Sequence, residues 1–558
     1  MTQSNRPWLA AYPESVPADL DVESLPTLVD IVEQSFALHG PRIAYTFLGR
    51  DIAYAQVDAQ SLALAAYFQD VGLKPGDRVA VMLPNVPQYP VAAIAALRAG
   101  LVLVNVNPLY TARELEHQLN DAGASAIIVL ENFAGTLADC IRLTSVKHVV
   151  VARVGDMLGV LKGFMANAAV RHMKKAVQPY ALPEAVAFNT AIKRGRARQF
   201  NRPRVSPEDM AVLQYTGGTT GVSKGATLLH RNIAANVLQT EMWNRPTTAT
   251  IPADEQPTVV CALPLYHIYA LTVVMLLTLR MGGKVILIPD ARDLKGLLKT
   301  LAETRFHYLP AVNTLFNALL NHADFDSVDW SSLRLTTGGG MATQAAVAER
   351  WHRKTGCFIH DGYGMSEASP TVTANPSNIP AFSGTIGLPL PSTWVKCIDD
   401  DGREVPLGQP GEIAIKGPQV MAGYWKRPDE TVKVMTADGY MRSGDMGIMS
   451  ANGYVRIVDR KKDMVLVSGF NVYPNEVEDV VARMSGVAEC AVVGVPDGQT
   501  GEAVKLVIVR RDVALNEADV RAFCSENLTA YKRPRIVEFR ESLPKTPVGK
   551  ILRRALRE

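Results

Sequence analysis

Short apolar runs alternate with longer segments of helical periodicity through most of this 558-residue chain. The apolar runs are residues 79–83, 101–106, 126–130, 259–261, 285–288 and 333–336. Helical patterns, such as residues 88–99, lie between them. Continuous apolar strands joined through helices are typical of a parallel sheet covered on both faces. We therefore predict an α/β fold whose large N-terminal part contains two α/β sheet layers.

The pattern of apolar and turn residues changes after Val395. Short strands there alternate with turns such as Asp400-Asp401-Gly402, which predicts a small β-rich subdomain. The charge cluster Asp459-Arg460-Lys461-Lys462-Asp463 then precedes a fresh α/β segment. A charge run is also typical of a solvated surface. We expect an N-terminal domain over 1–459, a hinge linker over 460–462 and a small mobile α+β C-terminal domain over 463–558.

Composition narrows the class of protein. Hydrophobic residues make up 47% and charged residues 20%, as in an ordinary globular protein. A net charge of +3 without a basic stripe argues against nucleic-acid partners. The six cysteines form no C-x-x-C pair, the N-terminus lacks the apolar region of a signal peptide, and the apolar segment 268–279 is shorter than a membrane span. We therefore expect a cytoplasmic protein.

The segment from Tyr215 to Gly225 combines glycines, hydroxyl residues and one lysine directly after an apolar run. Glycines let several backbone N–H groups face an anion, and hydroxyls and a lysine add donors and charge. Ser223 precedes Lys224 and Gly225 follows it, so the order differs from a Walker A loop. No G-x-G-x-x-G fingerprint is present either. The segment predicts a phosphate-binding loop, although a plain flexible turn has the same composition.

Further motifs suggest a nucleotide site. They are Leu263-Pro264-Leu265-Tyr266-His267, Thr337-Gly338-Gly339-Gly340, Asp361-Gly362-Tyr363-Gly364-Met365-Ser366-Glu367, Arg442-Ser443-Gly444-Asp445 and Pro544-Lys545-Thr546-Pro547-Val548-Gly549-Lys550. A tyrosine between glycines can stack on a base, and a carboxylate beside phosphates needs an intervening Mg²⁺ ion. Each motif alone is also compatible with an ordinary turn. Their order along the chain carries the information.

That order resembles the adenylate-forming superfamily of acyl-CoA synthetases, adenylation domains and luciferases. Residues 105–110, 458–476 and 549–554 are similar to bacterial long-chain fatty-acid CoA ligases, and the resemblance covers about residues 8–557. It implies two half-reactions. A fatty carboxylate attacks the α-phosphate of ATP to give acyl-AMP and pyrophosphate, and coenzyme A then displaces AMP. ATP, Mg²⁺ and coenzyme A are the implied cofactors and co-substrates.

The resemblance also assigns roles to residues of this chain. The implied catalytic residues are Lys550, Glu367, Thr219 and Ser366, and Thr219 and Glu367 are the implied Mg²⁺ ligands. Nucleotide binding falls to Thr216, Gly217, Gly218, Thr219, Thr220, Gly221, Lys224, Gly339, Gly340, Asp361, Gly362, Tyr363, Gly364, Ser366, Asp445 and Arg460. Ser468 and Gly469 line the coenzyme A channel, Lys462 is the hinge, and Tyr215, His267, Ile268 and Leu271 line the acyl pocket.

Several alternatives stay open at this stage. An aryl-acid or amino-acid ligase of the same superfamily would need a polar substrate pocket, whereas residues 268–273 are largely apolar. A non-catalytic scaffold would be expected to have lost Lys550 or Glu367. Residues 157–178 place apolar side chains and lysines at near-helical spacing, which fits either a packed surface helix or peripheral membrane contact. A homodimer is also compatible with the sequence.

Overall fold

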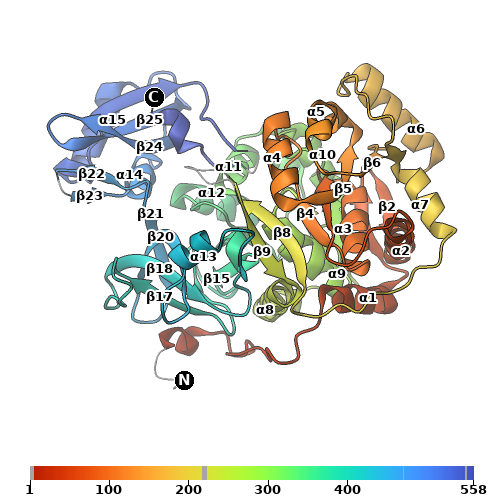
Figure 1. The fold of residues 1–558 in the computed structure, drawn as a ribbon. Helices are drawn as coiled ribbons and strands as arrows, with labels where there is room; N and C mark the ends of the chain where they lie inside the picture. Colours follow the sequence, from red (N-terminus) through yellow and green to blue (C-terminus); the bar gives the residue numbers. More distant parts are fainter. Residues whose placement is uncertain (1–5, 217–222, 469, 547–548, 558) are drawn as a thin grey trace.

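The structure is a computed structural model that describes residues 6–216, 223–468, 470–546 and 549–557. Two large sheets form most of the molecule (Figure 1). The eight-stranded sheet runs in the order β19 (Gly423–Tyr424), β9 (Lys224–Leu229), β8 (Met210–Thr216), β4 (Val102–Asn105), β3 (Arg78–Met82), β5 (Ala124–Leu130), β6 (His148–Ala152) and β7 (Val186–Ala187). Its strands from β8 to β7 pair in parallel.

The nine-stranded sheet is also mainly parallel. It runs in the order β16 (Leu388–Pro389), β15 (Thr371–Ala374), β14 (Ile359–Gly364), β13 (Leu335–Gly338), β12 (Tyr308–Ala311), β10 (Thr258–Cys261), β11 (Lys284–Leu287), β1 (Ile43–Phe47) and β2 (Arg50–Ala53). Strands from β14 to β1 are parallel, and the strands at both edges are antiparallel to their neighbours.

Helices cover these sheets on both faces, as the continuous apolar strands predict. They are α1 (Leu28–His39), α2 (Tyr54–Asp70), α3 (Gln88–Arg98), α4 (Ala112–Ala122), α5 (Ala134–Cys140), α6 (Val160–Ala168), α7 (Phe188–Arg196), α8 (His230–Thr248), π-helix η6 (Ala270–Leu276), α9 (Leu277–Arg280), α10 (Leu294–Ala302), α11 (Asn313–Leu320) and α12 (Ala345–Thr355). Val79 and Val81 of β3 belong to one core, whereas Ala80 and Met82 belong to another. Every residue of α3 is buried.

The expected β-rich part follows. Its four strands, β17 (Trp394–Ile398), β18 (Pro410–Lys416), β20 (Met441–Met449) and β21 (Val455–Arg460), pair only in antiparallel fashion. The short helix α13 (Pro428–Val434) lies between β18 and β20 in the chain. These observations confirm the predicted mixed α/β architecture of the large part.

The last hundred residues form a smaller lobe beside α11 and α12 (Figure 1). It contains β22 (Val465–Val467), β23 (Phe470–Val472), α14 (Pro474–Val481), β24 (Val487–Asp497), β25 (Gly501–Arg510), α15 (Glu517–Asn527) and β26 (Ile536–Arg540). Its two buried clusters contain only residues from Val465 onward. The proposed hinge at 460–462 stays a prediction. Among the described helices, none has the length and apolar character to span a bilayer.

Candidate functional site

Several motifs meet at the carboxyl ends of β13 and β14. These strands are parallel, so Gly338 and Gly364 end them at the same edge of the sheet. Such edges commonly form binding sites in α/β proteins. The loop of Lys550 reaches this edge, because a Cβ added to Gly340 would lie 3.1 Å from Lys550 Cε. Gly340 also has a φ of +78°, so both its conformation and its neighbour favour glycine.

Lys550 sits on a tight turn that rests on α11. Its carbonyl accepts a hydrogen bond from Thr546 N at 2.7 Å, and its own N–H donates to Thr546 Oγ1 at 3.1 Å. Thr314 Oγ1 of α11 donates to the Gly549 carbonyl at 3.0 Å. The lysine is therefore positioned by the large part of the molecule as well as by its own lobe.

The charge of Lys550 is set by three side chains from other motifs. Burial lowers the pKa of Lys550 to about 8, and Arg460 lowers it as well, whereas Asp445 and Glu367 raise it. Groups must lie close together to interact in this way. The structure thus brings Lys550, Arg460, Asp445 and Glu367 together, although they span almost two hundred residues of sequence.

Asp445 lies on β20 at the centre of this group. Tyr363 donates its hydroxyl to Asp445 Oδ2 at 2.7 Å, and Arg460 Nε lies 3.3 Å from Asp445 Oδ1. Asp445 and Arg460 are register partners of β20 and β21. The side chain of Asp445 is only 12% exposed, and both donors orient its carboxylate.

Glu367 belongs to the short 3-10 helix η8 (Ser366–Ala368) and is buried. Burial raises the pKa of its carboxyl, and Tyr424 donates its hydroxyl to Glu367 Oε1 at 2.8 Å. Lys224 Nζ lies 5.3 Å from the centre of the Tyr424 ring and forms an ion pair with Glu430. The lysine after the glycine-rich loop therefore lies beside the residue that supports Glu367.

The glycine-rich loop itself falls largely outside the described residues. Its predicted members Gly217, Gly218, Thr219, Thr220 and Gly221 are in that segment. The described ends, Thr216 of β8 and Lys224 of β9, are antiparallel partners, and Ser223 Oγ donates to the Thr216 carbonyl at 2.9 Å. The loop thus connects two paired strands next to the Lys224–Tyr424 contact.

The segment after Leu263-Pro264-Leu265 also reaches the site. Burial lowers the pKa of His267 to about 3, and the charge of Lys550 lowers it too, so this histidine is neutral. Tyr269 and Tyr308 both contact Thr337, with each hydroxyl 2.8 Å from Thr337 Oγ1. A Cβ on Gly339 would lie 3.0 Å from the Tyr269 ring, which accounts for the glycine.

Asp361 is buried against neighbouring residues of the protein itself. Its carboxylate accepts from Thr343 Oγ1 at 2.5 Å, and a Cβ on Gly338 would come within 2.0 Å of Asp361 Oδ1. Burial raises the pKa of Asp361 to about 7. A Cβ added to Gly362 would lie 3.2 Å from the Thr373 carbonyl oxygen of β15, and one added to Gly364 would lie 2.1 Å from the Pro370 carbonyl oxygen just before that strand. The predicted contact of this segment with nucleotide stays a prediction.

The predicted acyl-pocket residues lie in two places. Ile268 and Leu271 are buried in the large core between the sheets. Tyr215 packs in the core beside α4, where its hydroxyl donates to Asp121 Oδ2 at 2.6 Å. The structure therefore brings Ile268 and Leu271 together, near His267, but places Tyr215 in another core.

The described channel residue, Ser468, lies apart from this site. Ser468 follows β22, donates its N–H to the Thr500 carbonyl at 2.8 Å, and is exposed. Figure 1 shows β22 on the outer side of the small lobe, away from α11. Gly469 is outside the described residues. Lys462 follows β21, where burial lowers its pKa.

Sequence reasoning missed three supporting residues. Asn85 donates to the carbonyls of Cys261 and Leu263, both at 3.0 Å, and accepts from Leu265 N at 2.8 Å, so it fixes the segment before His267. A polar residue just after an apolar strand was the available signal. Tyr424 and Thr314 carry no such signal, because only tertiary contacts reveal their roles.

The chain was compared with known proteins. The profile described as AMP-binding enzyme matches residues 32–425, and that described as AMP-binding enzyme C-terminal domain matches residues 476–550. A long-chain-fatty-acid–CoA ligase of Escherichia coli O6:H1 is 52% identical over 552 residues, covering 99% of this chain and 98% of the relative. The structure of ATP-bound MatB from Rhodopseudomonas palustris has a TM-score of 0.79 at 30% identity. The match covers 95% of this chain and 98% of MatB. The anthranilate CoA ligase AuaEII, in complex with anthranoyl-AMP, has a TM-score of 0.83 at 25% identity, covering 96% and 98%. The chain therefore belongs to the AMP-binding enzyme family.

Proposed function

We propose that this protein is an ATP-dependent ligase that converts a medium- or long-chain fatty acid into its coenzyme A thioester through an acyl-AMP intermediate. The observation that carries the proposal is the meeting of Lys550 with Arg460, Asp445 and Glu367 at the carboxyl ends of β13 and β14. The relative from Escherichia coli named a long-chain-fatty-acid–CoA ligase supports the choice of substrate.

In the first half-reaction, a carboxylate oxygen of the acid forms a bond to the α-phosphorus of ATP. The bond from that phosphorus to the bridging oxygen breaks, and pyrophosphate leaves with the electron pair. Negative charge accumulates around the α-phosphate, so a cation held in place beforehand stabilises the transition state. Lys550 fills this role because its turn is fixed by Thr314 and its charge is balanced by Asp445 and Glu367.

The remaining nucleotide contacts follow from the same geometry. Asp445 is held by Tyr363 and Arg460, and its carboxylate would accept hydrogen bonds from ribose hydroxyls. We assign Gly339, Gly340 and Tyr363 to the base, and Ser366, the first residue of η8, to the α-phosphate. The donors at 216–221 and Lys224 would bind the β- and γ-phosphates.

The residues fit a magnesium ion of the kind that accompanies ATP. Mg²⁺ in such sites uses one or two carboxylates together with substrate phosphates. Glu367 offers a buried carboxylate with a raised pKa, and among the described residues it accepts a side-chain hydrogen bond from the neutral Tyr424 hydroxyl. Among the described residues, no cluster of three or more acidic, histidine or cysteine side chains could hold a metal by itself. Glu367 and Thr219 would hold the ion, which neutralises phosphate charge.

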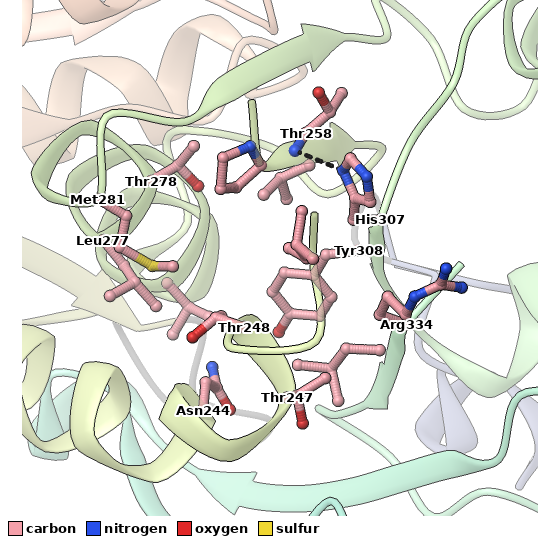
Figure 2. A pocket seen from close by; sticks show the side chains of 15 residues that line it. Asn244, Thr247, Thr248, Thr258, Leu277, Thr278, Met281, His307, Tyr308 and Arg334 are labelled. Carbon is pink, nitrogen blue, oxygen red and sulfur yellow. Dashed lines mark hydrogen bonds between the residues drawn. The ribbon is translucent and has the colours of Figure 1, made fainter. Parts of the chain in front are cut away.

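A largely apolar cavity lies farther along the same sheet and would hold the end of an alkyl chain. It contains about 470 Å³ of space not filled by atoms, part of it open to solvent. Figure 2 shows Leu277 and Met281 at one side of this cavity and Tyr308 at its centre. Tyr308 also bonds Thr337, next to Tyr269 at the catalytic edge. Helix η6, which follows Tyr269, contributes Val273 to the cavity wall.

The second half-reaction requires another arrangement of the small lobe. Lys550 occupies the site here, whereas β22, the strand that Ser468 follows, lies on the outer side of the lobe (Figure 1). We place the N-terminal domain at 1–459, the hinge at 460–462 and the mobile domain at 463–558. Rotation about Lys462 would withdraw Lys550 and bring Ser468 and Gly469 to the coenzyme A channel. The thiol gives up its proton to solvent as its sulfur bonds to the acyl carbon. The bond from that carbon to the former carboxylate oxygen breaks, and AMP leaves with this oxygen and the electron pair.

We also place the protein in the cytoplasm, in contact with lipid surfaces through the helical segment 160–173. Val160, Phe164 and Met173 are 95%, 72% and 82% exposed there, and exposed Lys174 and Lys175 follow. Apolar and basic side chains on one surface segment favour anionic bilayers. Cosedimentation with anionic vesicles should be lost in Phe164→Ser/Met173→Ser, and retention of binding in this variant would rule out the segment.

The substrate assignment is tested by pyrophosphate release across saturated acids of increasing length, with benzoate and amino acids as controls. We expect turnover to require an alkyl acid and to remain high for acids that reach the Val273 cavity. Activity restricted to aromatic or amino acids would instead establish the aryl-acid or amino-acid alternative.

A further inference from the structure

A polar groove, separate from the apolar cavity, lies on the seam between the large part and the small lobe. Helices α11 and α12 form one wall, and the segment from the end of α14 into β24 forms the other. It contains about 630 Å³ of space not filled by atoms, part of it open to solvent. Four arginines line it: Arg350, Arg353, Arg483 and Arg511. None of these residues belongs to the catalytic cluster.

The positive charge of this groove is poorly compensated. Within the parts of the chain that the structure describes, no ion pair involves any of the four arginines. Burial lowers the pKa of Arg350, and the charges of Arg511 and Arg353 lower it further. Two acidic residues line the groove, and Glu489 is already paired with Lys545 at 2.6 Å. The charge of Arg483 also acts on Asp479, whose pKa it lowers, so Glu349 is left to balance the other three guanidinium groups.

Arg350 and Arg511 are oriented by neutral partners. Arg350 Nη2 donates to Asn321 Oδ1 at 2.8 Å, and Arg350 and Arg353 lie three residues apart on α12, so they share a helix face. Across the seam, Arg511 Nη1 donates to the Ser485 carbonyl at 3.3 Å. Its backbone N–H also donates to Gly486 O at 2.8 Å. The groups that repel each other are therefore held facing one groove.

We infer that this groove is a binding site for a phosphate-bearing anion with two or more negative charges. Guanidinium groups bind phosphate oxygens through paired hydrogen bonds, and a multivalent anion would relieve the repulsion between Arg350 and Arg511. Both walls contribute arginines, so the complete site exists only while the small lobe rests on α11 and α12.

The site is thereby coupled to the position of the small lobe. Asn317 Nδ2 of α11 donates to the Ala488 carbonyl at 3.0 Å across the seam nearby. A ligand that binds one arrangement better shifts the population toward it. Occupancy of the groove favours the arrangement that places Lys550 at the catalytic edge.

The test uses the full-length protein saturated with Mg²⁺ and α,β-methylene-ATP, which fills the nucleotide site without reacting. Inorganic pyrophosphate is then titrated by calorimetry. We expect one further site in the wild type and at least tenfold weaker binding in Arg350→Gln/Arg511→Gln. The control Arg196→Gln/Arg403→Gln removes the same charge from exposed positions elsewhere and should bind as the wild type does. Unchanged binding of α,β-methylene-ATP shows that each variant is folded.

Three results would overturn the inference. They are the absence of a second site at millimolar pyrophosphate, equal affinity in both double variants, and equally tight binding of citrate, which would exclude phosphate recognition. Coupling is read from trypsin cleavage after Lys461 and Lys462, which pyrophosphate should slow in the wild type and not in Arg350→Gln/Arg511→Gln. Equal cleavage rates with and without pyrophosphate in the wild type would contradict the coupling.

Discussion

The two ends of β12 and β13 differ in chemistry although they belong to the same strands. The carboxyl ends carry Gly338 and face Lys550 and its charged partners, whereas the amino ends, at Tyr308 and Leu335, line a largely apolar cavity. Tyr308 connects the two ends, because it lines the cavity and bonds Thr337. Reaction chemistry and substrate length can therefore be altered separately.

The largest effect is expected at the charged end. Lys550→Ala removes the cation at the α-phosphate and should lower acyl-AMP formation by about 10²–10³-fold, or about 3–4 kcal/mol. Thioester formation from supplied acyl-AMP should stay within a few fold. Rapid-quench assays of each half-reaction measure both rates, with Lys545→Ala, whose partner is Glu489, as the matched control. Equal loss of both half-reactions would contradict the division of roles.

The same lysine should set the pH dependence of the first half-reaction. Only charged Lys550 stabilises the α-phosphate, so acyl-AMP formation should be sustained below its pKa of about 8 and fall as pH rises through it. Well above that pKa, the fraction of Lys550 that is charged falls about tenfold for each pH unit. His267 faces the site as a neutral group, because burial and the charge of Lys550 lower its pKa to about 3. Lys550→Arg should reduce the loss of acyl-AMP formation at alkaline pH. If the pH profile of this variant is unchanged, the alkaline loss arises from another group.

A bulky substitution at the amino ends should change length preference alone. Val273→Trp fills the cavity and should lower kcat/KM for a sixteen-carbon acid about tenfold, or about 1.4 kcal/mol, because the indole takes the space of the end of the alkyl chain. An eight-carbon acid should change by less than about twofold. Val432→Trp, at a position 74% exposed on α13, is the control. A uniform loss for both acids would place the alkyl chain elsewhere.

The smallest effect on activity is expected for a substitution that leaves Asp445 paired with Arg460. Tyr363→Phe removes the hydroxyl that donates to Asp445, but Arg460 still holds the carboxylate. We expect KM for ATP to rise about fivefold, consistent with one hydrogen bond of about 1 kcal/mol, and kcat to change little. Steady-state kinetics with ATP varied measure this split. A fall in kcat without a change in KM would give Tyr363 a different role.

Sequence patterns predicted the architecture well. Continuous apolar runs such as 126–130 became β5, and the buried segment at 268–279 became η6 and α9. Periodicity reports burial directly, so these elements follow from local residues. The strand order could not be predicted, because pairing of β1 with β11 joins segments more than two hundred residues apart.

The candidate site was predicted in part. Glu367, Asp445 and Lys550 were identified from motifs, and the structure brings them together. Tyr215 was expected in the acyl pocket, but its ring packs beside α4, because successive residues of a strand point to opposite faces. The Asn85 and Tyr424 contacts and the arginine groove depend on side chains from distant elements, which local patterns do not report.

The most direct test follows oxygen from the acid into the product. A long-chain fatty acid labelled with ¹⁸O in both carboxylate positions is turned over with ATP, Mg²⁺ and coenzyme A, and the nucleotide is analysed by mass spectrometry. An acyl-AMP intermediate requires that AMP carry one ¹⁸O atom for each thioester formed. Unlabelled AMP, or label in inorganic phosphate, would contradict the proposed reaction at the Lys550 site.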